Sequence, residues 1–299
     1  MSASQSLAAP RPSSRLMRDV LGVFKPRIGL MIMLTALVGL AFAPGPGLAW
    51  GQVLVLAVAV FVSSASAGAF NQYVEAGSDR LMARTRGRAF ATGALPRRPA
   101  WLALIAALLA VSVGAAWWAL NVWAALYTFL GAFTYAVVYT VWLKRRTWLN
   151  IVVGGLAGSF AVLAGATAVD PSPGALPLLL ALVLFLWTPP HFWSLAIANR
   201  DDYAAAGVPM LPVVVGTERA AWAVFWSTVA LVAASLLPAL YGAGLLYLAG
   251  AAAGGAYFLR KAWLLARQPS RKTAMASFFA SLVQLSLVLG AAGVDPLLR

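Results

Sequence analysis

The chain has 299 residues, of which 62% are hydrophobic and only 10% charged, and its formal net charge is +14. A mean hydropathy of +0.84 excludes an ordinary soluble domain and predicts an all-α protein that crosses the membrane several times. Because the chain contains no cysteine, it has no disulfide, thiolate metal site or cysteine nucleophile.

Nine apolar segments are long enough to span a bilayer, which takes about 17 to 25 residues. They are residues 28–45, 50–72, 99–119, 122–143, 149–169, 175–198, 219–241, 243–265 and 273–294. We therefore expect one transmembrane domain of nine helices at 28–299, preceded by a disordered basic tail at 1–27. The tail has no apolar core, so a cleaved signal peptide is not expected.

The basic residues predict the orientation of this bundle. All but one of the 22 lysines and arginines fall in the tail or in the loops after the second, fourth, sixth and eighth spans. By the positive-inside rule these segments are cytoplasmic, and the C-terminus with Arg299 lies outside. Topology thus accounts for the net charge without a nucleic-acid partner.

The end of the second span carries the first candidate site. Asn71, Glu75 and Asp79 recur at every fourth position, so on a helix they lie within roughly 80° of one another. Their oxygen atoms suit Mg²⁺, which one or two carboxylates hold while substrate phosphates and waters complete its shell. Four arginines that suit the same polyphosphate follow, at Arg80, Arg84, Arg86 and Arg88. The alternative is a solvated charged loop, which would leave Glu75 unpaired near the bilayer.

Two further segments bring cations to the cytoplasmic side. Lys25-Pro26-Arg27 opens the first span, where proline suits a helix start and the cations either anchor the chain or bind phosphate. The fourth span ends at Tyr139-Thr140 and Lys144-Arg145-Arg146. Glycines at 154, 155 and 158 then predict close helix packing rather than a chemical role.

The sixth span contains the second candidate site. Thr188-Pro189-Pro190 predicts a kink, and His191, the only histidine of the chain, follows directly. If the helix resumes, Asp202 lies on nearly the same face, about 16 Å further along the axis. By itself, His191 is either a structural residue or a contact to a ligand.

Two acidic pairs are expected to meet at one membrane face. Glu75 with Asp79, and Asp201 with Asp202, end spans that run in the same direction, and together they are half of the eight acidic residues. The alternative for the second pair is a helix end that pairs with Arg200. The last three spans carry almost no polar side chains and are expected to close the bundle.

Three motifs resemble the protohaem IX farnesyltransferase family, the haem O synthases, a branch of the intramembrane aromatic prenyltransferase superfamily. They are Asn71-x3-Glu75-x3-Asp79-x2-Met82-x-Arg84-Thr85, YTVWLKRRTWLNIVVGGLAG (139–158) and TPPHFWSLAIANRDDYAAAGVPMLP (188–212). The last is the most specific, because relatives that prenylate quinone-ring precursors are not expected to share the PHFW run. Two departures stand out: Ala89-Phe90-Ala91-Thr92-Gly93 replaces a Pro-Leu-Pro-Ser-Gly-like stretch, and Glu75 stands where many relatives have Asp.

The resemblance implies that a farnesyl group passes from farnesyl diphosphate to a vinyl group of haem B, with addition of water. The implied ligands of Mg²⁺ and diphosphate are Asn71, Glu75, Asp79, Asp201 and Asp202. The implied catalytic set is Asn71, Glu75, Asp79, Arg84, Lys144 and Asp202, and the implied substrate-binding set is Arg27, Arg88, Tyr139 and His191, the last in contact with haem.

Two other functions remain open at this point. A prenyltransferase that acts on another aromatic or tetrapyrrole acceptor would share every feature except the His191 segment. A transporter would also be helical, but the chain shows no internal repeat and its acids lie at one face rather than at the midplane. The expected location is the lipid bilayer of the bacterial inner (cell) membrane, with the mitochondrial inner membrane as the less favoured alternative. Partners among haem-pathway enzymes or terminal oxidases stay open.

Overall fold

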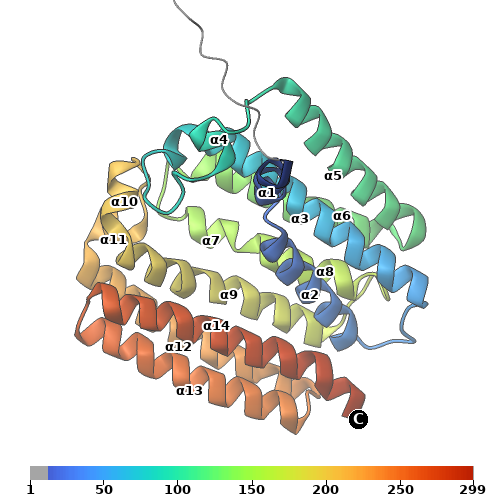
Figure 1. Cartoon of the computed structure of the whole chain (residues 1–299). Helices are drawn as coiled ribbons and strands as arrows, with labels where there is room; N and C mark the ends of the chain where they lie inside the picture. The colour runs from blue at the N-terminus through green and yellow to red at the C-terminus, as the bar shows by residue number, and fades with distance from the viewer. Residues whose placement is uncertain (1–12, 299) are drawn as a thin grey trace, which may run out of the picture.

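The structure is a computed structural model that describes residues 13–298, and every regular element in this range is a helix (Figure 1). The all-α fold expected from composition is therefore confirmed. The long helices are α2 (Pro26–Phe42), α3 (Trp50–Asp79), α5 (Pro99–Ala119), α6 (Val122–Phe133) continued by the π-helix η1 (Thr134–Leu143), α9 (Ala175–Ala198), α12 (Thr217–Leu236), α13 (Leu245–Arg267) and α14 (Arg271–Val294). The short elements are α1 (Ser13–Val23), α4 (Ala89–Thr92), α7 (Asn150–Gly154), α8 (Leu156–Ala166), α10 (Arg200–Ala205), α11 (Leu211–Val215) and the 3-10 turns η2 (Leu237–Tyr241) and η3 (Asp295–Leu298).

Seven helices of the described range are long and apolar enough to cross a membrane, so the chain is an integral membrane protein. Two of the nine expected spans are not among the seven. The segment expected at 149–169 consists of two shorter helices, α7 and α8, that meet at Gly155. The other, α13, is long enough, but it carries Arg260, Lys261 and Arg267 in its last two turns. Nine spans thus remain a prediction.

Helices that follow one another along the chain pack side by side, and the last returns to the first. Contacts join α2 to α3, α3 to α5, α5 to α6, α6 to α8, α8 to α9, α9 to α12, α12 to α13 and α13 to α14, and α14 also contacts α2. In Figure 1, α12 to α14 lie below α9, whereas α3, α5 and α6 form the opposite side. The result is a closed bundle in which α2, α8 and α9 lie between these two groups.

Helices α2 and α8 are in direct backbone contact because glycines lie at their crossing. A Cβ atom on Gly39 would overlap the backbone of Val162, and one on Gly165 would overlap the backbone of Ala36. Small residues allow membrane helices to approach closely and so gain van der Waals contacts. The packing role expected at residues 154 and 155 is confirmed too, since added Cβ atoms there would lie 3.0 Å from the Tyr139 ring and 2.9 Å from the Thr188 side chain.

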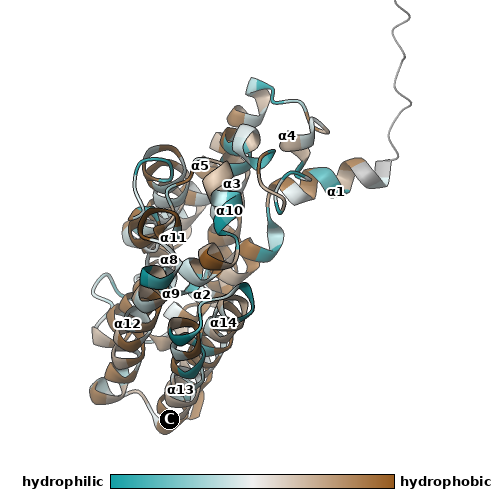
Figure 2. Ribbon diagram, turned by 90° about the vertical axis from the view of Figure 1, so that its left-hand side faces the viewer, coloured by the Kyte–Doolittle hydropathy of each residue, from teal (hydrophilic) through white to brown (hydrophobic). Residues whose placement is uncertain are grey.

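The expected disordered tail is wrong for its second half. Ser13–Val23 forms α1, and α2 already begins at Pro26; residues 1–12 lie outside the described residues. The helix is stabilised by packing of its apolar side, because Val23 belongs to a buried cluster that includes Phe90, and Val20 and the following Phe24 pack against this cluster. In Figure 2, α1 extends sideways from the helical bundle.

The sixth expected span, 175–198, is confirmed as α9, but the helix does not continue to Asp202. Helix α9 is not interrupted at Pro189 and Pro190 but runs to Ala198. It ends at Asn199, after which α10 begins at Arg200. Asp202 therefore lies on a separate short helix, and the argument that it shares a face of one helix with His191 is wrong.

Candidate active site

A buried hydrogen-bond network lies at the C-terminal end of α3. The Asn71 Nδ2 atom donates to Glu75 Oε2 at 2.7 Å and to Thr140 Oγ1 on η1 at 3.1 Å. The Asn71 Oδ1 atom accepts from Lys25 Nζ, also at 2.7 Å. Every polar atom of the Asn71 side chain therefore has a partner, and the predicted common face of Asn71 and Glu75 is confirmed.

Glu75 forms an ion pair with Lys144, which reaches it from the end of η1. The two residues are only 4% and 6% exposed, and the Lys144 ammonium lies 5.6 Å from the centre of the Tyr139 ring. A charge buried to this degree is tolerated when it is paired, and removal of one partner leaves the other uncompensated. Glu75 is thus not the unpaired acid of a solvated loop.

The next acidic residue, Asp79, ends α3 and pairs with Arg88. The Arg88 Nη1 atom lies 2.9 Å from both carboxylate oxygens, and Thr85 donates to the Asp79 carbonyl oxygen at 3.0 Å. The residues between Asp79 and Arg88 form a turn that brings the Arg88 side chain back to Asp79. Arg80 does not take part, because its Nε atom donates to the carbonyl oxygen of Ala91.

Arg84 connects this turn to α10. Its Nη2 atom donates to the Tyr203 hydroxyl at 2.9 Å, and its guanidinium lies 5.3 Å from the centre of the same ring. Burial raises the pKa of Tyr203, and the charge of Arg84 lowers it by less. The phenol therefore stays protonated at neutral pH and keeps a proton to donate. Arg86 is exposed as well, but its side chain makes no hydrogen bond or ion pair with any residue of 13–298.

The π-helix η1 supplies several of these groups. Tyr135 and Tyr139 stack with their ring centres 5.8 Å apart, and the Tyr135 hydroxyl accepts from Lys25 Nζ at 3.1 Å. A π-helix has a wider turn than an α-helix, with hydrogen bonds that span five residues instead of four. Lys144 shows this spacing, because its backbone N–H donates to the carbonyl oxygen of Tyr139. Single π turns are frequent at functional sites, because they change which side chains share a face.

Among residues 13–298, the second acidic pair forms no hydrogen bond or ion pair with this network. Asp201 is exposed and Asp202 half-buried, and both line an open polar cavity of about 520 Å³. The other lining residues are Ala83, Ile197, Ala198, Asn199, Arg200, Thr217, Ser270 and Arg271. Within residues 13–298, the structure contains no cluster of three or more His, Asp and Glu side chains that would hold a metal by themselves.

The structure thus joins most, but not all, of the residues expected in the site. Bonds within the network connect Asn71, Glu75 and Lys144, with the Tyr139 ring against Lys144, and separate contacts join Asp79 to Arg88 and Arg84 to α10. Arg27 is exposed at the start of α2, whereas Lys25, two residues earlier, is the cation that enters the network.

Sequence reasoning did not single out Tyr135, Tyr203 or Ser78, and it named Arg145 only as one of three cations at the end of the fourth span. The Arg145 Nη2 atom donates to Ser78 Oγ at 2.6 Å. Two signals were available: Tyr203 directly follows the second acidic pair, and Tyr135 precedes Tyr139 by one helical turn.

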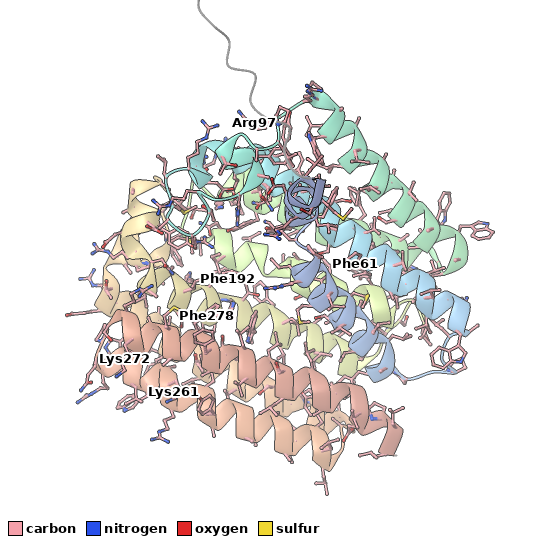
Figure 3. All side chains as sticks on the ribbon, viewed as in Figure 1. Phe61, Arg97, Phe192, Lys261, Lys272 and Phe278 are labelled. Atoms are coloured by element: carbon pink, nitrogen blue, oxygen red, sulfur yellow. The ribbon has the colours of Figure 1, made fainter. Side chains whose placement is uncertain are left out.

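His191 lies on α9 where this helix contacts α14, and it is 6% exposed. Its ring lies between Trp187 and Phe278, with ring centres 4.0 Å and 4.5 Å away, and its Nδ1 atom is 2.7 Å from Ser281 Oγ. Figure 3 shows Phe278 of α14 beside Phe192, which follows His191 on α9. The imidazole is therefore fixed in orientation by aromatic rings and one hydrogen bond.

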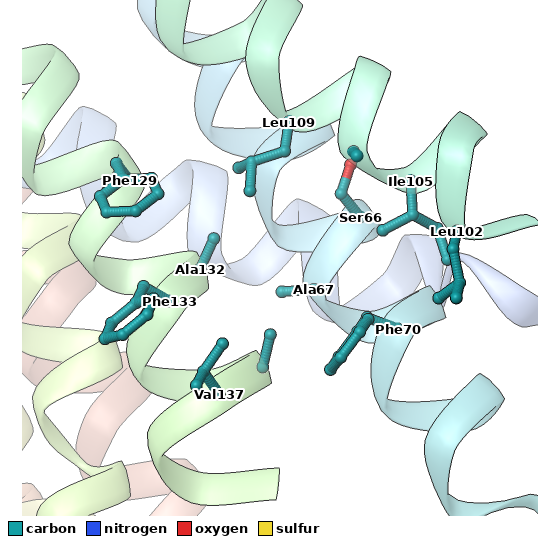
Figure 4. Close-up of a pocket in the computed structure, with 12 residues that line it drawn as sticks. Ser66, Ala67, Phe70, Leu102, Ile105, Leu109, Phe129, Ala132, Phe133 and Val137 are labelled. Carbon is teal, nitrogen blue, oxygen red and sulfur yellow. The ribbon is translucent and has the colours of Figure 1, made fainter. Parts of the chain in front are cut away.

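An apolar cavity of about 350 Å³ lies between α3, α5, α6 and η1 (Figure 4). Its walls include Phe70, Leu102, Leu109, Phe129 and Phe133. None of the charged residues of the network lines it, so we treat it as separate from the candidate site.

Comparison with known proteins identifies the family. The model of the UbiA prenyltransferase family matches residues 32–283. Protoheme IX farnesyltransferase 2 of Paramagnetospirillum magneticum is 55% identical over 276 residues, which are 92% of this chain and 96% of that protein.

Solved structures agree on the fold. A structure from work on digeranylgeranylglyceryl phosphate synthase aligns with a TM-score of 0.78 at 19% identity, over 95% of this chain and 100% of that one. A UbiA homologue from Archaeoglobus fulgidus bound to DMAPP and Mg²⁺ aligns with a TM-score of 0.71 at 18% identity, over 90% and 98% of the two chains. Sequence and fold together therefore show that the chain belongs to the UbiA prenyltransferase family.

Proposed function

We infer that this chain is a protohaem IX farnesyltransferase, a haem O synthase. It transfers a farnesyl group from farnesyl diphosphate to a vinyl group of haem B and releases diphosphate. The observation that carries this inference is the 55% identity to a protein of that name over nearly the full length of both chains. In the balanced reaction the farnesyl carbon bonds to one vinyl carbon, a hydroxyl from water adds to the other, and the remaining proton of water is released.

We assign the diphosphate to the network at the end of α3. Three cations already contact the residues of the first motif in the structure. Lys25 contacts Asn71, Lys144 contacts Glu75, and Arg88 contacts Asp79. Diphosphate oxygens would take these cations as hydrogen-bond donors, and charge-assisted bonds of this kind are the strong ones. Arg84 lies on the same turn and adds a fourth cation.

The same side chains fit a Mg²⁺ ion. Glu75 and Asp79 offer two carboxylates one helical turn apart, and Mg²⁺ in such sites takes one or two carboxylates together with substrate phosphates. Asp201 and Asp202 would complete the metal and diphosphate site from α10. When bound, Mg²⁺ neutralises charge on the diphosphate as it leaves. A homologue bound to Mg²⁺ and DMAPP supports this assignment.

The residues of the chain then perform three tasks in the reaction. Lys144, Arg84 and Arg88 stabilise the negative charge that develops on the leaving diphosphate, and this interaction is strongest at Lys144, which is buried. The packed helices exclude bulk water from the allylic cation, which would otherwise be hydrolysed. On α9, His191 contacts the haem and orients its vinyl group.

We also propose that the chain spans the bacterial cell membrane nine times, with its N-terminus in the cytoplasm and its C-terminus outside. Support comes from the nine consecutive helical segments that pack in order around the bundle, with α7 and α8 together forming one of them. The charge distribution supports the same orientation, because the network and the basic loops then share the cytoplasmic side.

Incubation of the purified, detergent-solubilised protein with farnesyl diphosphate, Mg²⁺ and haem B tests this function. Mass analysis should find haem that has gained one farnesyl and one hydroxyl group. A parallel incubation with quinone-ring precursors should give no prenylated product. Prenylation of a quinone precursor with unchanged haem would contradict the inference and favour the other class of acceptor.

A further inference from the structure

Two buried serines of α14 face α9. Ser281 and Ser277 lie one helical turn apart, and both side chains are inaccessible to solvent. Ser281 Oγ lies 2.7 Å from His191 Nδ1, and Ser277 Oγ lies 2.9 Å from Ser194 Oγ. The two bonds are alike in depth and in the helices they join, but only Ser281 contacts an imidazole.

The direction of the bond between Ser281 and His191 follows from the other contact of Ser281. Its hydroxyl oxygen lies 2.6 Å from the carbonyl oxygen of Phe278. At this distance two oxygen atoms need a proton between them, and a serine hydroxyl has only one proton. Since that proton points at Phe278, the Nδ1 atom of His191 must be the donor to Ser281.

This assignment determines the role of the other ring nitrogen. In a neutral imidazole that carries its proton on Nδ1, Nε2 has a free lone pair. The rings of Trp187 and Phe278 fix the plane of the imidazole, and among residues 13–298 no hydrogen bond reaches Nε2. Nε2 is therefore oriented and free to bind haem iron or to accept a hydrogen bond from the acceptor.

We propose that Ser281 is a positioning residue that holds His191 with its proton on Nδ1 and so presents the Nε2 lone pair to the haem, an inference that rests on the function proposed above. Ser281 does not itself touch the haem. Histidines that bind metals commonly have the same arrangement, in which a hydrogen bond at one nitrogen sets the tautomer and orientation of the ring.

Ser281→Ala tests the proposal, with Ser277→Ala as the matched control. Loss of one hydrogen bond that orients a ligand should weaken haem B binding roughly 2- to 12-fold in a spectral titration. Ser277→Ala removes a similar bond between the same helices, but it should leave the haem titration unchanged. The KM for farnesyl diphosphate should stay at the wild-type value in both variants.

Two more variants separate positioning from stability. Ser281→Thr keeps the hydroxyl and should restore haem affinity. In a His191→Ala background, Ser281→Ala should cause no further loss, because the residue it positions is gone. Ser281→Ala and Ser277→Ala should also have equal thermal stability, which would show that the loss of haem affinity in Ser281→Ala does not come from a less stable fold.

The proposal is overturned if Ser281→Ala and Ser277→Ala bind haem B equally well, if Ser281→Ala weakens haem and farnesyl diphosphate in parallel, or if it weakens haem further in the absence of His191. These outcomes leave the proposed function intact, because they concern variants only. The proposed function itself fails if the wild-type protein does not prenylate haem B.

Discussion

The two acidic motifs look alike in the sequence but differ in the structure. Glu75 and Asp79 are 4% and 1% exposed, and each is paired with a cation. Asp201 and Asp202 instead face an open polar cavity. The first motif therefore has its charges already compensated, whereas the second is accessible to a ligand from outside.

This difference indicates how a diphosphate would enter. Under the proposed assignment, a diphosphate at the first motif would displace Lys144 and Arg88 from the carboxylates, which would then be free for Mg²⁺. At the second motif no such exchange is needed. Arg84 and Tyr203 connect the two motifs, because Arg84 belongs to the turn after α3 and Tyr203 follows Asp202 on α10.

The largest expected effect is on turnover and is shared by both motifs. Asp79→Ala and Asp202→Ala should each lower kcat by a factor on the order of 10² to 10³. Losses of this size are found when a group that stabilises transition-state charge is removed. Asp170→Ala, at an exposed acid far along the chain from both motifs, is the control and should keep wild-type turnover. A normal rate for Asp202→Ala would restrict the site to the first motif.

The next effect separates the two motifs by stability. Lys144→Ala leaves Glu75 charged and unpaired in the bundle, which should lower the free energy of unfolding by about 3 to 5 kcal/mol. Asp201→Ala, at an exposed position, should change it by less than about 0.5 kcal/mol. Denaturation in detergent measures both, with Lys272→Ala as a control at an exposed lysine. Similar losses for Lys144→Ala and Lys272→Ala would show that the buried pair contributes nothing.

A smaller effect concerns substrate affinity. Arg84→Ala should raise the KM for farnesyl diphosphate roughly 10- to 100-fold, since a hydrogen bond to a charged group contributes about 1.5 to 3 kcal/mol. Arg86 lies two residues away and forms no side-chain hydrogen bond or ion pair within residues 13–298, so Arg86→Ala should leave KM nearly unchanged. Equal effects would mean that the turn acts only as diffuse positive charge.

The smallest effect tests the connection between the motifs. Tyr203→Phe keeps the ring but removes the hydroxyl that accepts from Arg84, and should cost about 0.5 to 1.5 kcal/mol in transition-state binding, read from kcat/KM. Combined with Arg84→Ala, the same change should have no added effect. Additive losses would show that Tyr203 acts independently of Arg84.

Local sequence rules predicted the parts of the fold that depend on local chemistry. The spans expected at 99–119 and 175–198 coincide with α5 and α9, because each apolar run is as long as the helix that it forms. The spacing of Asn71 and Glu75 likewise predicted their contact, since a helix brings such positions together wherever it lies.

Features that depend on long-range packing were not predictable in this way. Nothing local distinguishes Lys144 from Arg145, yet the first pairs with Glu75 and the second with Ser78. The same holds for the end of α9 at Asn199, which places Asp202 on a separate helix. Which cation reaches which acid is set by how η1 and α3 pack against each other.

Calorimetric titration of farnesyl diphosphate into the wild-type protein, with and without Mg²⁺, tests the diphosphate site most directly. We expect binding that depends on Mg²⁺ in the wild type and that is lost in Asp79→Asn, a variant that keeps the size of the side chain. Asp170→Asn, handled identically, should bind as the wild type does. Equal affinity of Asp79→Asn and the wild type in Mg²⁺ would contradict the assignment of the diphosphate to the end of α3.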